Sequence, residues 1–347
     1  MNCMNGKGTD ERMMRRCIEL ALCGREESRP NPMVGAVIVV PAATDGDGCD
    51  EVRIIGEGYH VRCGEGHAEV NAIASVKTED EPFLKDATVY VSLEPCAHFG
   101  KTPPCCDLII RKGVRRVVVG CVDPFAQVQG RGIQRIREAG IAVTVGVLEE
   151  ECRWLNRRFF TFHEKHRPYI ILKWAQTADG FIDNHGKALA ISTPLTKMLV
   201  HRLRAEEDAI LVGRTTWEQE HPQLNVREWS GREPERMVLS QGVKESGSQD
   251  ICCVGSVEEA LRCCYEKQWQ SLIVEGGAKT LQSFLDADMW DEIRVETNPR
   301  LQVSDGTKAL LLPNHAKVLS EQIIDDNTII TFCRSQQAPL PTAESPI

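Results

Sequence analysis

Two short stretches of the sequence carry side chains that bind metal ions. "GEGHAEVNAI" (residues 64–73) places His67 and Glu69 at the start of an expected helix, and "EPCAHFGKTPPCC" (residues 94–106) carries three thiols. A catalytic zinc ion takes three protein ligands such as imidazole and thiolate, and keeps its fourth position for water. That water ionises near neutral pH, and a carboxylate that is not a ligand can carry its proton. We therefore predict a zinc centre formed by His67 and two cysteines, with Glu69 as the proton carrier.

The cysteine ligands are expected at the ends of secondary-structure elements. Cys96 follows a proline at the end of an expected strand, and Cys105 follows two prolines at the start of a helix, whose dipole favours a thiolate. His-x-Glu followed by Pro-Cys and a further Cys matches the zinc-deaminase signature, although that signature has two residues between its cysteines and this chain has eight. The spacing leaves Cys105 and Cys106 both open. A structural zinc, or no metal, is the alternative.

The order of the expected elements indicates two α/β units, because strands and helices alternate along both halves. In the first half we expect a helix over 10–24, strands in "VGAVIVV", "RIIGEGYH", "ATVYVSL", "RRVVVGCVD" and "IAVTVGV", and helices in "HAEVNAIASV", from about 105 and in "IQRIREAG". In the second half we expect strands in "YIILKWA", "DAILVG", "RMVLS", "SLIVEGG" and "DEIRVETNP", and helices near 194–205, 256–267 and 278–287. The predicted divisions are a first domain over 8–148, a linker over 149–167, a second domain over 168–334 and a disordered Pro- and Ser-rich tail over 335–347.

Composition disfavours several classes of function. A chain of 347 residues with 42% hydrophobic and 26% charged residues is typical of a soluble globular enzyme with about two domains. The net charge of −9 disfavours a nucleic-acid partner, whose phosphates require clustered Lys and Arg. The longest apolar run is too short to cross a membrane, and the first residues do not resemble a signal peptide. We expect no membrane association, a cytoplasmic location and reduced cysteines.

Longer motifs resemble one family. With "PNPMVGAVIV", "GEGYH", "HAEV", "PCAHFGKTPPC", "DPFAQVQGRG" and the second half, the chain from about residue 10 to about residue 333 is similar to the bifunctional riboflavin-biosynthesis proteins of the RibD family. The resemblance implies a three-layer cytidine-deaminase-like domain, then a dihydrofolate-reductase-like α/β domain, with zinc and NADPH as cofactors. It implies His67, Cys96 and Cys105 as ligands and Glu69 as proton donor. It also implies a homo-oligomer, a dimer through the reductase domain.

The resemblance implies two reactions on a phosphorylated pyrimidine. The first removes the 2-amino group of 2,5-diamino-6-(5-phospho-ribosylamino)pyrimidin-4-one by hydrolysis, and the second uses NADPH to reduce the ribosyl side chain to ribityl. Family positions that line the deaminase pocket fall on Asn31, His60, His98 and Lys101. The alternative role of Asn31, which stands between two prolines, is to shape a turn. The alternative role of His98 is to form a hydrogen bond within its loop. A phosphate on the substrate suits Lys101.

The second half is less informative by itself, because it lacks Gly-x-Gly-x-x-Gly. Gly276 and Gly277 follow an apolar strand, where their backbone amides could cradle a phosphate or simply turn the chain into a helix. By resemblance, Lys173 lies near the reaction centre, with a solvent-facing lysine as the alternative. The implied cofactor contacts are Gln176, Ser192, Thr216, Glu220, Ser240 and Gly277. The implied substrate contacts are Arg204, Leu224, Arg227 and Glu275.

Three positions depart from the family pattern. Glu220 stands where Asp is usual, Ala188 replaces a substrate-binding Ser, and Ala190 replaces a Trp near the cofactor. This altered pocket wall makes a deaminase alone, with an inactive reductase-like half serving association, the alternative to a bifunctional enzyme. A nucleic-acid deaminase would need a basic, aromatic-lined groove. A zinc-binding scaffold without activity is a further alternative, and such a protein would lose nothing on replacement of Glu69 by Gln.

Overall fold

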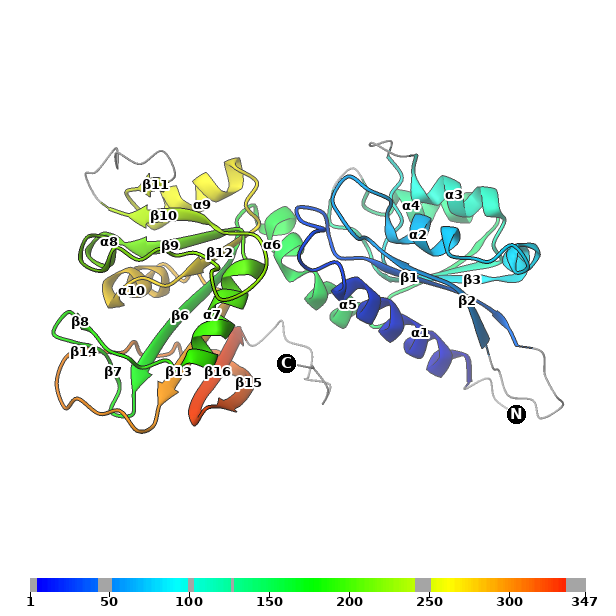
Figure 1. The fold of residues 1–347 in the computed structure, drawn as a ribbon. Coiled ribbons are helices and arrows are strands. Elements are labelled where there is room, and N and C mark those ends of the chain that lie inside the picture. Colours follow the sequence, from blue (N-terminus) through cyan, green and yellow to red (C-terminus); the bar gives the residue numbers. More distant parts are fainter. Residues whose placement is uncertain (1–4, 43–51, 99–102, 126–127, 241–250, 335–347) are drawn as a thin grey trace. The chain divides into compact units, whose positions relative to one another are not determined.

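The computed structural model describes residues 5–42, 52–98, 103–125, 128–240 and 251–334. The chain divides into two compact units, Met1–Glu164 and Lys165–Ile347. Each contains a main β-sheet flanked by helices, which confirms the predicted α/β class (Figure 1). Among the described residues, no helix has the length and apolar character needed to span a bilayer.

The first unit is built on a five-stranded sheet in the order β2-β1-β3-β4-β5. β1 pairs antiparallel with β2 and β3, whereas β3, β4 and β5 run parallel. The strands are rich in valine and isoleucine, whose branched side chains fit a buried pleated surface. Their bounds are β1 (Gly35–Pro41), β2 (Val52–Tyr59), β3 (Thr88–Leu93), β4 (Arg116–Cys121) and β5 (Ala142–Val145).

Helices cover both faces of this sheet and give three layers (Figure 1). Because side chains alternate along a strand, Ala36 and Ile38 of β1 pack in a core with α2, α3 and α4. Val37 and Val39 pack in a second core with α1, α5 and α6. The helices are α1 (Asn5–Leu22), α2 (Ala68–Ala74), α3 (Cys105–Lys112), α4 (Arg131–Glu138), α5 (Glu149–Leu155) and α6 (Arg157–Lys165), with a 3₁₀-helix at Glu81–Asp86.

The stretch expected as a linker, 149–167, forms α5 and α6. Cys152, Phe159 and Phe160 of these helices are buried in the core that contains α1. Burial of a large apolar side chain such as phenylalanine stabilises a fold by about 1.5–3 kcal/mol, so these helices contribute several kcal/mol to the stability of the first unit. The first unit therefore extends to Glu164 in the structure.

The second unit is built on an eight-stranded sheet in the order β11-β10-β9-β12-β6-β13-β16-β15. Neighbouring strands run parallel except in the C-terminal hairpin, where β16 pairs antiparallel with both β13 and β15. This hairpin is an element that the sequence analysis did not predict. The bounds are β6 (Tyr169–Thr177), β9 (Ala209–Gly213), β10 (Glu235–Leu239), β11 (Ile251–Val254), β12 (Ser271–Val274), β13 (Glu292–Asn298), β15 (Ala316–Ile324) and β16 (Asn327–Arg334).

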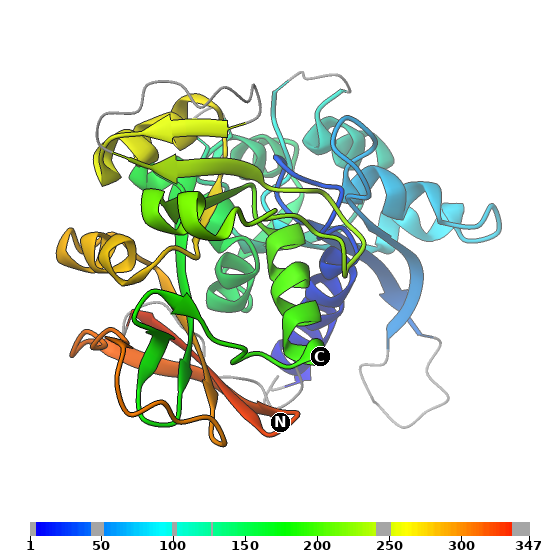
Figure 2. The same ribbon diagram turned by 60° about the vertical axis from the view of Figure 1, so that its left-hand side comes forward.

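The helices of the second unit also lie on two faces (Figure 2). One apolar core joins the sheet to α9 and α10, and the other joins it to α7 and α8. A small sheet in the order β14-β7-β8 contacts the main sheet through β7 and β6. The helices are α7 (Pro194–Glu206), α8 (Arg214–Glu220), α9 (Val257–Glu266) and α10 (Ala278–Asp286), and the small strands are β7 (Phe181–Asn184), β8 (Lys187–Ala188) and β14 (Thr307–Lys308).

The parallel strands position several of the expected reductase residues. The carboxyl ends of parallel strands meet at one edge of a sheet, which is where ligands of such sheets bind. Thr216 and Glu220 follow β9, Ser240 follows β10, and Glu275 and Gly277 follow β12. The sheet order thus brings together residues that are far apart in the sequence. For example, the backbone N–H of Gly277 donates to Thr216 Oγ1, 61 positions away, at 3.3 Å.

Candidate metal centre and active sites

The side chains of His67, Cys96 and Cys105 converge in the first unit. His67 Nδ1 lies 3.5 Å from Cys96 Sγ and 3.4 Å from Cys105 Sγ, and the three ligand atoms all lie within 4.8 Å of one another. A tetrahedral zinc ion separates imidazole nitrogen and thiolate sulfur by about 3.6 Å, given bonds of about 2.1 and 2.3 Å. Among the described residues, this is the one group of three or more His, Cys, Asp or Glu side chains spaced to hold a metal ion.

Element ends deliver all three candidate ligands. His67 is the N-cap of α2, and Cys105 is the first residue of α3. Cys96 follows β3, and its sulfur accepts a hydrogen bond from the backbone N–H of Cys105 at 3.3 Å. The N–H of Cys106 donates to the carbonyl oxygen of Cys96 at 3.2 Å. The first turn of α3 is therefore tied to the loop that carries Cys96.

Cys106 points elsewhere. Its side chain is buried in the apolar core between the sheet and α2, α3 and α4, and burial raises the pKa of its thiol to about 11. Its sulfur lies 3.6 Å from Asp107 Oδ1. Of the two adjacent cysteines that the spacing left open, the fold brings only Cys105 to His67 and Cys96.

The two converging thiols shift each other's pKa in opposite directions. Hydrogen bonds from the Cys105 thiol and from His67 lower the pKa of Cys96 to about 4, and the same thiol contact raises the pKa of Cys105. The contact with Cys96 also raises the pKa of His67. Two sulfurs and an imidazole nitrogen this close together suit a divalent cation, whose binding releases the protons that these groups hold.

Glu69 lies in the first turn of α2 and is only 3% exposed. Burial, and then the charge of Cys96, raise the pKa of its carboxyl group to about 7. A buried carboxyl group with such a pKa can both take up and release a proton at neutral pH, which is what a general acid–base residue requires. The fold therefore places the predicted proton carrier beside the three candidate ligands.

Asn31 and His60 lie against the same centre. His60 Nδ1 lies 3.1 Å from the carbonyl oxygen of Gly66, so it donates there and leaves Nε2 to accept from Asn31 Nδ2 at 3.1 Å. The His60 ring meets the His67 ring edge-on, with centroids 5.2 Å apart. Burial lowers the pKa of His60, which keeps this ring neutral. Two of the four residues that were expected to line the deaminase pocket therefore lie beside a candidate zinc ligand.

His98 is the third of the expected pocket residues. His98 Nδ1 is buried, and has no hydrogen-bond partner among the residues that the structure describes. Its ring packs edge-on against Phe125, with centroids 6.3 Å apart. Lys101 lies outside the described residues.

Glu94 is a supporting residue that the sequence analysis missed. It is 4% exposed, and its carboxylate accepts four backbone N–H groups at the start of α4 and in the loop before it. The donors are Asp123 at 3.3 Å, Gly130 at 2.9 Å, Gly132 at 3.0 Å and Ile133 at 3.2 Å. Glu94 thereby fastens α4 to the strand end that carries Cys96. The sequence shows only that an acidic residue precedes Pro-Cys. It does not show which backbone N–H groups that residue binds.

Arg204 and Glu275 form a largely buried ion pair in the second unit. Arg204 Nε and Nη2 donate to the two carboxylate oxygens of Glu275 at 3.0 and 2.7 Å, and both side chains are largely buried. Arg204 Nη1 also donates to the carbonyl oxygen of Asn225 at 3.2 Å. Burial raises the pKa of Glu275, but the charges of Arg204 and Lys173 outweigh it and keep the group ionised.

Lys173 lies beside this pair rather than in open solvent. Burial lowers the pKa of Lys173, and the negative charges of Glu275 and Glu296 oppose that effect. A lysine in such surroundings gives up its proton more readily than an exposed one. The structure therefore disfavours the solvent-facing alternative for Lys173.

Some of the expected cofactor residues have hydrogen-bond partners in the second unit. Gln176 Oε1 accepts from Trp174 Nε1 at 2.9 Å, and Ser192 Oγ donates to Glu296 Oε2 at 2.7 Å. Ser240 Oγ is buried without a partner among the described residues. Burial and the charge of Asp183 raise the pKa of Glu220, at the end of α8.

The double glycine at 276–277 has a packing role. A Cβ atom on Gly276 would lie 2.7 Å from the backbone nitrogen of Gly213, whereas one on Gly277 would meet only Thr216 Oγ1 at 3.4 Å. Gly276 therefore lets two strand ends approach closely. Gly277 is the N-cap of α10, where free backbone N–H groups can meet an anion.

The other expected substrate residues differ in exposure. The Leu224 side chain is buried in the core with α7, so a substrate could meet only its backbone, which has a φ of 52°. Arg227 is 53% exposed and donates to Asn225 Oδ1 at 2.9 Å. Ala188 and Ala190 are exposed, so the positions that depart from the family pattern lie at a surface.

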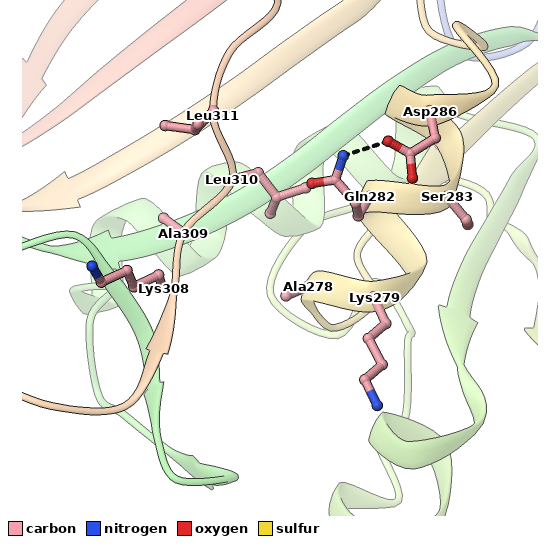
Figure 3. Close-up of a pocket in the computed structure, with 9 residues that line it drawn as sticks. All are labelled: Ala278, Lys279, Gln282, Ser283, Asp286, Lys308, Ala309, Leu310 and Leu311. Carbon is pink, nitrogen blue, oxygen red and sulfur yellow. Dashed lines mark hydrogen bonds between the residues drawn. The ribbon is translucent and has the colours of Figure 1, made fainter.

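A cavity of about 460 Å³ lies between α10 and the chain after β14 (Figure 3). None of the expected site residues lines it. Figure 3 shows Gln282 and Asp286 joined across one turn of α10, with Lys308–Leu311 opposite. The lining residues are Ala278, Lys279, Gln282, Ser283, Asp286, Lys308, Ala309, Leu310 and Leu311.

Comparisons with known proteins agree with both units. Residues 7–121 match the cytidine and deoxycytidylate deaminase zinc-binding region, and residues 168–303 match the RibD C-terminal domain. The riboflavin biosynthesis protein RibD of Aquifex aeolicus is 37% identical over 84% of this chain and 87% of that protein. RibD of Escherichia coli is 42% identical, over 66% of this chain and 59% of its own length.

Solved structures give the same result over almost the whole chain. A diaminohydroxyphosphoribosylaminopyrimidine deaminase/5-amino-6-(5-phosphoribosylamino)uracil reductase from Thermotoga maritima is 34% identical, with a TM-score of 0.82, over 95% of this chain and 99% of its own. Acinetobacter baumannii RibD is 28% identical, with a TM-score of 0.83, over 95% of this chain and 100% of its own. The chain therefore belongs to the RibD family of riboflavin biosynthesis proteins, as a zinc-dependent deaminase domain followed by a reductase domain of the NADPH-using type.

Proposed function

We propose that this chain catalyses two successive steps of riboflavin biosynthesis. The first is hydrolytic deamination of 2,5-diamino-6-(5-phospho-ribosylamino)pyrimidin-4-one, and the second is NADPH-dependent reduction of the ribosyl side chain to ribityl. The convergence of His67, Cys96 and Cys105 beside buried Glu69 is the observation that carries the proposal. The name of the Thermotoga maritima protein, which includes both activities, supports it.

In the deaminase site, His67, Cys96 and Cys105 would hold the zinc ion, which supplies an ionised water at neutral pH when bound. Glu69 takes up the proton that this water loses and passes it to the departing amino group, which leaves as ammonia. The neutral His60 and the side chain of Asn31 form a fixed polar wall for the pyrimidine. His98 and Lys101 are further proposed substrate residues, and a phosphate on the substrate suits the lysine.

In the reductase site, NADPH would supply a hydride to the anomeric carbon of the ribosyl group as the bond from this carbon to the ring oxygen breaks. Lys173 is proposed to give that oxygen its proton. Arg204 and Arg227 bind the phosphorylated substrate, since guanidinium groups match phosphate oxygens. Glu275 orients Arg204 through the paired hydrogen bonds, and Leu224 contributes its backbone. The proposed cofactor contacts are Gln176, Ser192, Thr216, Glu220, Ser240 and Gly277.

The proposed surroundings of the enzyme follow from its family and composition. We place it in the cytoplasm as a homodimer associated through the reductase domain, acting on a small phosphorylated pyrimidine rather than on nucleic acid. The net charge of −9 supports the last point, because a polynucleotide substrate demands a basic surface.

One coupled assay tests both activities. Purified protein with measured zinc content is given the diaminopyrimidine substrate, and ammonia release and NADPH oxidation are followed together. We expect both signals, with NADPH oxidation dependent on prior deamination. Ammonia release without NADPH oxidation, also on the deaminated intermediate, would leave only the deaminase alternative.

A further inference from the structure

Glu296 lies on the same face of the second unit's sheet as Lys173. In β13, the side chains of Arg294, Glu296 and Asn298 point to one face because side chains alternate along a strand. Arg294 pairs directly with Lys173 of the neighbouring parallel strand β6, so Lys173 shares that face. The opposite face carries Ile293 and the apolar core with α9 and α10. A polar patch therefore continues across two central strands of the sheet.

The carboxylate of Glu296 is 1% exposed and both of its oxygens are engaged. Oε2 accepts from Ser192 Oγ at 2.7 Å, and Oε1 accepts from Asn327 Nδ2 at 2.6 Å. An ionised carboxylate is retained in such a buried position only when donors and cations compensate it. Lys173 and Arg294 supply the compensating charge.

The same side chains hold the backbone next to Ser192. The carbonyl oxygen of Ile191 accepts from Asn298 Nδ2 at 2.9 Å and from Asn327 Nδ2 at 3.1 Å. Asn327 thus uses its amide group to join Ile191 to Glu296. Two strands, β13 and β16, therefore fix both the main chain and the side chain at positions 191–192, directly after exposed Ala190.

We propose that Glu296 is a positioning residue of the reductase site, which holds the Ser192 hydroxyl for contact with the nicotinamide cofactor. Because the Ser192 hydroxyl donates its proton to Glu296, its oxygen lone pairs stay available to accept a hydrogen bond from a donor on the cofactor. This inference rests on the proposed reductase function, in which Ser192 contacts NADPH.

The test compares NADPH dissociation constants of the full-length protein and its variants, measured by fluorescence titration. Glu296→Gln keeps the size of the side chain but leaves one accepting oxygen for two donors. Asn327 cannot turn its own oxygen toward the new amide without losing its bond to Ile191. Ser192→Ala removes the contact itself. We expect each variant to raise the dissociation constant for NADPH roughly tenfold, the upper end of what one lost hydrogen bond costs.

Glu292→Gln is the matched control. Glu292 is another buried carboxylate of β13, and its Oε1 accepts a hydroxyl proton, from Tyr169 at 2.6 Å. We expect Glu292→Gln and Glu296→Gln to lower the melting temperature alike, while only Glu296→Gln weakens NADPH binding. Deaminase turnover of every variant should equal that of the wild type, because the deaminase site lies in the first unit and the substitutions lie in the second.

The double variant Glu296→Gln/Ser192→Ala decides whether Glu296 acts through Ser192. We expect a dissociation constant no more than about tenfold above the wild type, because the second change removes nothing further. Two results would overturn this inference and leave the proposed reductase function intact. One is a dissociation constant near a hundredfold above the wild type in the double variant, and the other is unchanged NADPH binding by Glu296→Gln. A wild-type protein that binds no NADPH overturns the proposed reductase function, and the inference with it.

Discussion

The backbone N–H of Cys105 donates to the sulfur of Cys96 at 3.3 Å, so the helix that supplies one candidate ligand also steadies the other. Cys96 and Cys105 are separated by eight residues in the sequence, and their sulfurs meet at the candidate metal centre. A sulfur held by a backbone amide needs little rearrangement to bind a metal ion, which is how preorganised sites gain affinity.

Replacing Cys105 by Ser should abolish stoichiometric zinc binding, because the hydroxyl is a poor replacement for one of three ligands. Cys106→Ser is the matched control: its sulfur points into the apolar core, so zinc content should stay near one per chain while stability falls modestly. Elemental mass spectrometry of both purified variants checks this. Equal zinc content in the two variants would contradict the geometry described for α3.

Glu69→Gln should retain zinc but lower deaminase turnover by about 10² to 10⁴, the usual contribution of a general acid–base residue. The amide fills the same buried space but cannot take up the proton of the attacking water. Ammonia release and zinc content of the same sample provide the measurement. NADPH binding serves as the internal control, and a variant with full turnover would remove Glu69 from the mechanism.

Arg204→Lys should raise the KM of the reductase for its phosphorylated substrate by roughly tenfold or more, since lysine cannot make the paired hydrogen bonds to Glu275. Arg202→Lys is the control on the same helix, because Arg202 pairs with Glu206 instead. NADPH-oxidation kinetics on the deaminated intermediate distinguish the two. A similar KM for both variants would exclude Arg204 from the substrate site.

Glu94→Gln should destabilise the first unit by about 1–3 kcal/mol, because the amide leaves some of four buried backbone N–H groups without an acceptor. Zinc should also be lost more readily to a competing chelator, since α4 no longer holds the strand end before Cys96. Denaturant unfolding and chelator competition measure the two effects. The exposed Glu138→Gln change on α4 should alter the free energy of unfolding by less than about 0.5 kcal/mol. If Glu94→Gln changed it no more than this control, the support role would be refuted.

Much of the candidate metal centre follows from the sequence alone. His67 and Glu69 at a helix start, with Pro-Cys after a strand, specify ligand types and a proton carrier by local spacing. The alternation of apolar runs likewise predicted α7, α9 and α10, because amphipathic periodicity is a local property of the chain.

Other features depended on tertiary structure. Only packing separates Cys105 from Cys106, since one face of α3 meets His67 and the next residue enters the core. Glu94 finds donors 29 to 39 residues away, and Glu296 finds Ser192 at a separation of 104. Hydrogen bonds between distant residues depend on strand order and on which helix covers which face. The sequence shows which side chains are able to form hydrogen bonds. Which of them are in contact depends on how the strands and helices are arranged in the folded protein.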